Sequence, residues 1–105
     1  MIRLTVLYNL APGTDEDAYV AWRLSAHAEY IRKMPGVTAA SFGRVLDEWS
    51  NGEAAGYRFQ STVEWPDRET FEKAFHNDQA QADLKRNLDK LGDYRFIVTE
   101  MLAGG

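Results

Sequence analysis

Apolar and polar positions alternate in several short segments of the chain, and this alternation predicts four strands. In residues 2–9 every second side chain is apolar or aromatic, as expected for a strand with one buried face. Residues 37–47 and 56–65 are rich in β-branched and aromatic residues, so they predict an antiparallel hairpin that turns near Asn51-Gly52. Residues 94–102 alternate again and predict the last strand.

Two other regions carry helical signals. A helix is predicted from about residue 15 to residue 33, because acidic residues stand at its start and Pro35-Gly36 follows its end. Asp67 can cap a second helical region. This region should break near Asn77 and resume with a new cap at Asp78.

The resulting order of elements is β-α-β-β-α-β, with Gly92 closing the second helical region. This order is typical of an α+β, ferredoxin-like fold, in which both helical regions cover one face of a four-stranded antiparallel sheet. At this length, residues 1–105 form a single domain. The helix-free face should carry apolar and aromatic side chains in either register, so we expect a homodimer that buries it.

Composition excludes several classes of function. Twelve basic residues, scattered along the chain, against 16 acidic ones give a net charge of −4, which argues against a nucleic-acid partner. The chain has no cysteine, which excludes disulfides and thiolate metal sites and fits a cytoplasmic protein. Residues 1–9 do not match a signal peptide or a membrane span. With no metal-binding motif and no glycine-rich phosphate loop, we expect no metal and no cofactor.

The first predicted helix carries the clearest chemical signal. On a helical wheel, Arg23 and His27 fall in the middle of the apolar face, with Tyr30 close by. A buried arginine needs either a carboxylate, such as Glu64, or a water-filled pocket. A histidine with a pKa near neutrality, an arginine for a developing anion and a tyrosine donor form an acid–base set. Alternatively, His27 is a core residue whose ring nitrogens bond to the backbone or to Tyr30.

A substrate slot between helix and sheet is a second candidate feature. Aromatic side chains could stack on an aromatic ligand there, although packing of the core explains them equally well. The candidate substrate-binding residues are Tyr8, Trp22, Phe42, Tyr57, Phe59, Glu64, Trp65 and Phe96. Trp49, near the hairpin tip, can be covered by a partner subunit or by a substrate.

The segment that contains Trp22-Arg23, His27, Tyr30 and Met34-Pro35-Gly36-Val37 resembles a known group of small proteins. It is similar to the RedY-like, or HapK-like, family of dimeric α/β-barrel proteins, and more distantly to EthD-type and antibiotic-biosynthesis monooxygenase domains. The resemblance implies a cofactor-free protein of bacterial secondary metabolism, associated with prodiginine or tryptophan-dimer (bisindole) pathways. The helix histidine of EthD-like domains corresponds to His27.

These observations lead to one main hypothesis and two alternatives. The main hypothesis is a cofactor-free enzyme that uses acid–base chemistry on a reactive aromatic intermediate, by elimination, cyclisation or rearrangement. His27, Arg23 and Tyr30 are its candidate catalytic residues, as proton shuttle, anion stabiliser and hydrogen-bond donor. The first alternative is a cofactor-independent monooxygenase. The second is a non-catalytic protein that binds a small molecule or serves as a scaffold.

Overall fold

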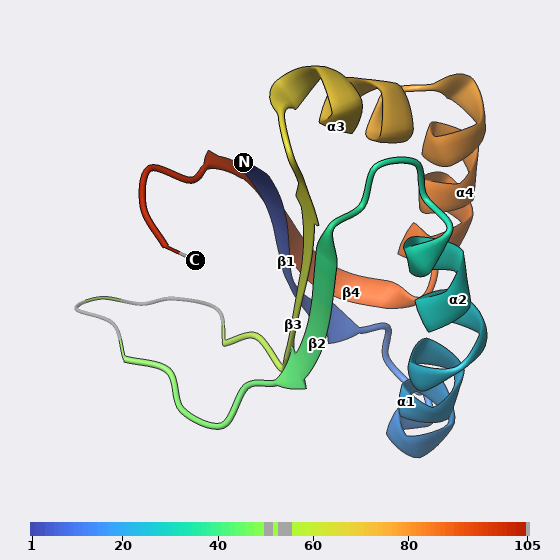
Figure 1. Ribbon diagram of the computed structural model, residues 1–105. Helices are drawn as coiled ribbons and strands as arrows, with labels where there is room; N and C mark the ends of the chain where they lie inside the picture. Colours follow the sequence, from blue (N-terminus) through green and yellow to red (C-terminus); the bar gives the residue numbers. More distant parts are fainter. Residues whose placement is uncertain (50–51, 53–55, 105) are drawn as a thin grey trace.

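The computed structural model describes residues 1–49, 52 and 56–104, and it shows one antiparallel sheet with helices on one face (Figure 1). The sheet order is β2-β3-β1-β4, which confirms the ferredoxin-like α+β fold. The elements are β1 (Ile2–Leu10), α1 (Glu16–Leu24), α2 (Ala26–Arg32), β2 (Ala39–Arg44), β3 (Phe59–Trp65), α3 (Arg68–Phe75), α4 (Asp78–Leu88) and β4 (Leu91–Glu100). The predicted turn at Asn51-Gly52 includes Asn51, which lies outside the described residues.

The first helical region is divided, so the prediction of one continuous helix is wrong. Ser25 separates α1 from α2 with backbone angles of φ −115° and ψ −92°, which are not helical. Its hydroxyl donates a hydrogen bond to the carbonyl oxygen of Ala21 at 2.7 Å. A serine side chain that bonds to the preceding turn in this way competes with regular helical geometry and often bends a helix.

The second helical region divides near Asn77, as predicted. Asp67 caps α3 by accepting a hydrogen bond from the backbone N–H of Thr70 at 2.7 Å. The cap of α4 is Asn77 and not Asp78, because the Asn77 side chain accepts from the N–H of Ala80 at 2.9 Å. The amide of Asn77 also donates to the last turn of α3, and a carboxylate could not make both bonds.

Strand β4 begins at Leu91, so Gly92 lies inside the strand and does not close the helix as expected. The pairing of β1 with β4 shifts register between Tyr8 and Leu10, close to this glycine. A Cβ atom at Gly92 would lie only 2.9 Å from the carbonyl oxygen of Leu10. Glycine is therefore required for the close approach of the two strands at the bulge.

The buried side chains between sheet and helices form two separate clusters. One cluster centres on Trp65 and Phe71, and the indole N–H of Trp65 donates to the carbonyl oxygen of Pro35 at 3.1 Å. The other consists of Tyr8, Tyr19 and Phe59. The partly buried Val6 packs against both clusters. The interior is thus divided along the length of β1 and β3.

The helix-free face of the sheet is mainly polar, contrary to the expectation of an apolar, aromatic face. Strand pairing places Arg3 opposite Glu64 and Thr5 opposite Thr62, and the Arg3 guanidinium donates to the Glu64 carboxylate at 2.8 Å. No aromatic residue of the described strands lies on this face, because every such ring alternates to the side that the helices cover. Leu7 is one of its few apolar members.

Candidate functional site

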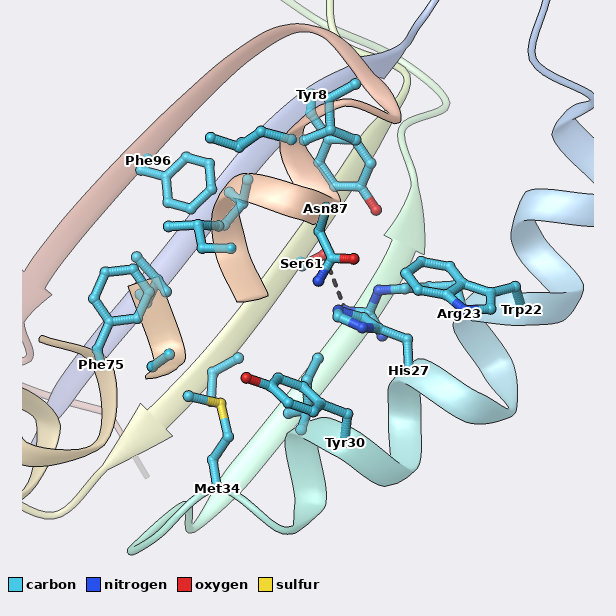
Figure 2. Close-up of a pocket in the computed structure, with 18 of the residues that line it drawn as sticks. Tyr8, Trp22, Arg23, His27, Tyr30, Met34, Ser61, Phe75, Asn87 and Phe96 are labelled. Atoms are coloured by element: carbon cyan, nitrogen blue, oxygen red, sulfur yellow. Dashed lines mark hydrogen bonds between the residues drawn. The ribbon is translucent and has the colours of Figure 1, made fainter. Parts of the chain in front are cut away.

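A cavity lies between the sheet and the helices, in the gap between the two core clusters (Figure 2). Its volume is about 130 Å³, whereas one water molecule needs roughly 10–15 Å³. Strands β1, β3 and β4 supply one wall, and the helices supply the other. The lining residues are Leu4, Val6, Tyr8, Tyr19, Trp22, Arg23, His27, Tyr30, Ile31, Met34, Ser61, Val63, Trp65, Phe75, Ala80, Leu84, Asn87, Leu88, Leu91 and Phe96.

The cavity has a polar end and an apolar end. Figure 2 shows Arg23, Ser61 and Asn87 close to Tyr8 and His27 on one side. Met34, Phe75 and Phe96 lie on the other side. A ligand that fills this space must therefore present its polar group to one end and its hydrophobic surface to the other.

Arg23, in the last turn of α1, is the charged residue at the polar end. Its side chain is buried, donates one hydrogen bond to the Ser61 hydroxyl at 3.1 Å, and lies 4.6 Å from the centre of the Phe42 ring. Within the described residues it has no carboxylate partner. Glu64, the partner considered from the sequence, points to the opposite face of the sheet, where it pairs with Arg3. Of the two expectations for Arg23, the structure therefore favours the open pocket.

His27, in the first turn of α2, lies between two aromatic rings. Its imidazole stacks on Trp22 with ring centres 4.6 Å apart and on Tyr30 at 5.7 Å. Burial, followed by the positive charges of Arg23 and Lys90, lowers the pKa of His27 to about 4. The expected pKa near neutrality is therefore wrong. At neutral pH the ring is uncharged, and it makes no hydrogen bond to a described residue, so one ring nitrogen can accept a proton.

Tyr30 lines the cavity and connects α2 with α4. Its hydroxyl donates to the carboxylate of Asp83 at 2.8 Å, and burial together with this contact raises the pKa of Tyr30 to about 12. The hydroxyl proton of Tyr30 is used in the hydrogen bond to Asp83. Tyr30 is therefore not free to donate this proton to a substrate, which was the role predicted from the sequence. A second hollow lies outside, and Trp22, His27, Tyr30 and Asn87 line both spaces.

A pair of buried tyrosines completes the polar end. The hydroxyl of Tyr19 donates to the hydroxyl of Tyr8 at 2.8 Å. Burial and the contact with Tyr8 raise the pKa of Tyr19 far above its ordinary value, so Tyr19 stays protonated. Because Tyr8 accepts in this pair, its own O–H remains able to donate to another acceptor.

The structure brings most of the predicted site residues together. Tyr8, Trp22, Trp65 and Phe96 line the cavity with Arg23, His27 and Tyr30. Phe42 and Phe59 lie behind the wall, where Phe42 contacts Arg23 and Phe59 stacks on Tyr8 at 5.6 Å. Tyr57 and Glu64 are not among the lining residues.

Three polar lining residues were missed from the sequence: Tyr19, Ser61 and Asn87. A signal for Asn87 does exist, since it lies within the apolar stripe that Leu84, Leu88 and Leu91 form at helical spacing. The same reasoning singled out Arg23. Ser61 carries a similar signal, since it is a polar residue in phase with the inward-facing Phe59, Val63 and Trp65 of its strand.

Other classes of site find no support in the part of the chain that the structure describes. No group of three or more histidine, aspartate or glutamate side chains there lies close enough to hold a metal ion. Among the described helices, none combines the length and the apolar character needed to cross a membrane.

Comparison with known proteins identifies the class of this fold and then its family. The chain is similar to the solved structure of an EthD-family protein from Bacillus halodurans, with 22% identity, a TM-score of 0.73, and coverage of 97% of this chain and 99% of that one. A family model described as REDY-like protein HapK matches residues 2–102. The chain therefore belongs to the REDY-like HapK family.

Two further solved structures show the same fold. HapK from Hahella chejuensis has 18% identity and a TM-score of 0.73, over 100% of this chain and 96% of that one. SnoaB, a cofactor-independent oxygenase from Streptomyces nogalater, has 10% identity and a TM-score of 0.70, over 98% of this chain and 94% of that one. Proteins described as dimeric and ferredoxin-like also match. No curated protein sequence matches.

Proposed function

We propose that this protein is a cofactor-free enzyme of bacterial natural-product biosynthesis that acts by acid–base chemistry on a reactive aromatic intermediate of the bisindole or prodiginine type. The observation that carries the proposal is that two polar side chains lie at the same end of an apolar cavity. They are the imidazole of His27, which is uncharged and makes no hydrogen bond to a described residue, and the buried guanidinium of Arg23, which has no carboxylate partner among the described residues. Membership of the HapK family and the likeness to a cofactor-independent oxygenase fit a role in secondary metabolism.

In this proposal His27 is the proton acceptor and Arg23 stabilises the charge that forms when the proton leaves. The neutral imidazole is ready to accept at physiological pH. A negative charge that develops beside the ring raises the pKa of the imidazolium, so the base becomes stronger as proton transfer proceeds. The apolar walls exclude water, which strengthens the attraction of Arg23 for an enolate or a similar anion.

We further propose that the enzyme works as a cytoplasmic homodimer. Dimeric proteins of the same fold support the assembly. The helix-free face of the sheet presents Arg3 and Glu64 side by side, so a second copy of the same face, related by a two-fold axis, offers opposite charges to both.

The decisive experiment is the reaction of the purified protein with a freshly generated bisindole or bipyrrole intermediate, followed by chromatography with mass detection. His27→Phe keeps an aromatic ring between Trp22 and Tyr30 but cannot accept a proton. His76→Phe is the matched control, since His76 is an exposed residue at the end of α3. We expect a new product with the wild type and with His76→Phe, and a loss of at least about 100-fold in rate with His27→Phe.

Running the same reaction without oxygen separates the two enzymatic possibilities. The likeness to SnoaB favours a cofactor-independent oxygenase as the second candidate, and only that reaction requires oxygen. An unchanged product distribution with the wild-type protein, in air and without it, would contradict both and would indicate a non-catalytic binding role.

A further inference from the structure

Arg23 is an unusual residue for a protein interior because its charge is not neutralised. The residue is 6% exposed. Its guanidinium has five N–H groups, yet the groups it contacts are neutral, among them the Ser61 hydroxyl, to which it donates, and the face of the Phe42 ring. Buried charges are normally paired with an opposite charge, because burial without a partner is costly.

No acidic side chain of the described chain supplies that partner. The lining residues of the cavity include no aspartate and no glutamate. Two carboxylates of the covering helices are engaged elsewhere: Asp83 of α4 with Tyr30 and Arg86, and Glu16 of α1 with Arg58. At the rim, the ammonium group of Lys90 lies 4.3 Å from the centre of the Trp22 ring and adds a second positive charge. The cavity therefore attracts a negative charge.

The remaining walls restrict what the anion can be. The other polar groups at this end are neutral, namely the hydroxyls of Tyr8, Tyr19 and Ser61, the amide of Asn87 and the uncharged imidazole of His27. The cavity wall itself carries one positive charge, since Lys90 is not among the lining residues, and a carboxylate matches that single charge while it accepts two parallel hydrogen bonds from the guanidinium. Beyond them the cavity continues between apolar side chains of the sheet and the leucines of α4. Apolar and aromatic walls of this kind favour the hydrophobic rings of an aromatic ligand.

We infer that the polar end of the cavity binds the carboxylate of a planar aromatic acid, and that this carboxylate is the missing counter-ion of Arg23. The acid group contacts the guanidinium and accepts from the Tyr8 hydroxyl. The ring system extends toward Met34 and Phe96. This inference rests on the proposed function for the substrate class, but binding alone tests it.

The test compares two probes that differ in charge and hardly in shape, naphthalene-2-carboxylate and naphthalene-2-carboxamide. Isothermal titration calorimetry at pH 7 measures the affinity of each for the full chain. We expect the carboxylate to bind at least about tenfold more tightly than the amide. The Arg23→Met variant should reduce this preference to less than about threefold. Arg68→Met, which removes an exposed arginine at the start of α3, should keep the wild-type preference.

Arg23→Lys keeps the charge, and it provides the test if Arg23→Met does not fold. The lysine variant should retain a preference for the carboxylate with affinity reduced about tenfold, because it cannot make two parallel hydrogen bonds to one acid group. Equal affinity of the wild type for both probes, no binding of either, or an undiminished preference in Arg23→Met would overturn the inference.

The inference and the proposed function can fail separately. Turnover of the pathway intermediate by a protein that shows no preference for the carboxylate would refute the carboxylate site and leave the enzyme intact. A strong preference that depends on Arg23, in a protein that leaves the intermediate unchanged, would confirm the site and refute the catalytic role.

Discussion

Replacing His27 by phenylalanine should make the protein less sensitive to acid. The pKa of His27 is about 4 in the folded protein and 6.5 in the unfolded chain. Above pH 6.5 neither state binds a proton at this residue. As the pH falls from 6.5 toward 4, the unfolded chain takes up a proton that the folded protein does not, so the free energy of unfolding decreases. Below pH 4 both states are protonated and the loss is complete.

The size of the effect follows from the pKa difference. A fall from 6.5 to about 4 corresponds to an upper limit of about 3 kcal/mol. The imidazole also lines the outer hollow, so solvent screens part of the penalty and we expect about 1–2 kcal/mol. His27→Phe preserves the stacking between Trp22 and Tyr30 and removes the titrating group.

The measurement is urea unfolding followed by far-ultraviolet circular dichroism at pH 7.5 and at pH 4.5. Carboxylates titrate in both proteins, so the difference between their losses of stability reports on His27. The wild type should lose about 1–2 kcal/mol more than the variant between the two pH values. If both proteins lose the same amount, the imidazole is not held uncharged by its surroundings, and the assignment of His27 as a neutral base is wrong.

Two further predictions concern the backbone and the helix that covers the cavity. Gly36→Ala should cost more stability than Gly13→Ala, by about 1–3 kcal/mol in thermal unfolding. Both glycines have positive φ, but of the two only Gly36 would place a Cβ against another side chain, the methyl group of Thr70, and Thr70→Ser should recover the excess. Tyr30→Phe should speed amide hydrogen exchange across α4, because α4 has no buried residue and the hydrogen bond from Tyr30 to Asp83 holds this helix to α2. Unchanged exchange in the variant would show that packing alone holds α4 in place.

The order of elements and the inward faces of the strands could be predicted because they depend on local patterns. Phe59, Val63 and Trp65 alternate with polar residues, and the structure buries all three. The break at Ser25 could not be predicted, because serine is tolerated in helices and only its hydrogen bond to the preceding turn disrupts this one. Gly92 was misassigned because its role depends on a close approach of two strands that are distant in sequence.

Only part of the site could be predicted, because a local pattern places residues of one helix relative to one another but not relative to other elements. Arg23 and His27 are four residues apart, so a helical wheel places them together even though α1 and α2 are separate helices. Their surroundings come from other elements: Ser61 from β3, Asp83 and Asn87 from α4. The depressed pKa of His27 depends on this tertiary context, which local patterns do not contain. The position of Glu64 on the helix-free face does follow from strand alternation with Val63 and Trp65, and it rules Glu64 out as a partner of Arg23.

The division of the core into two clusters bears on how easily such a protein can acquire a different substrate. The cavity occupies the boundary, whereas the most deeply buried side chains, Trp65, Phe71 and Phe59, belong to one cluster or the other. Substitutions at boundary positions such as Val6 or Ser61 would alter the volume or polarity of the cavity while leaving those three rings in place. Val6 and Ser61 are therefore positions at which the cavity can change without the loss of a core ring, whereas Trp65 serves both purposes, because it lines the cavity and anchors one cluster.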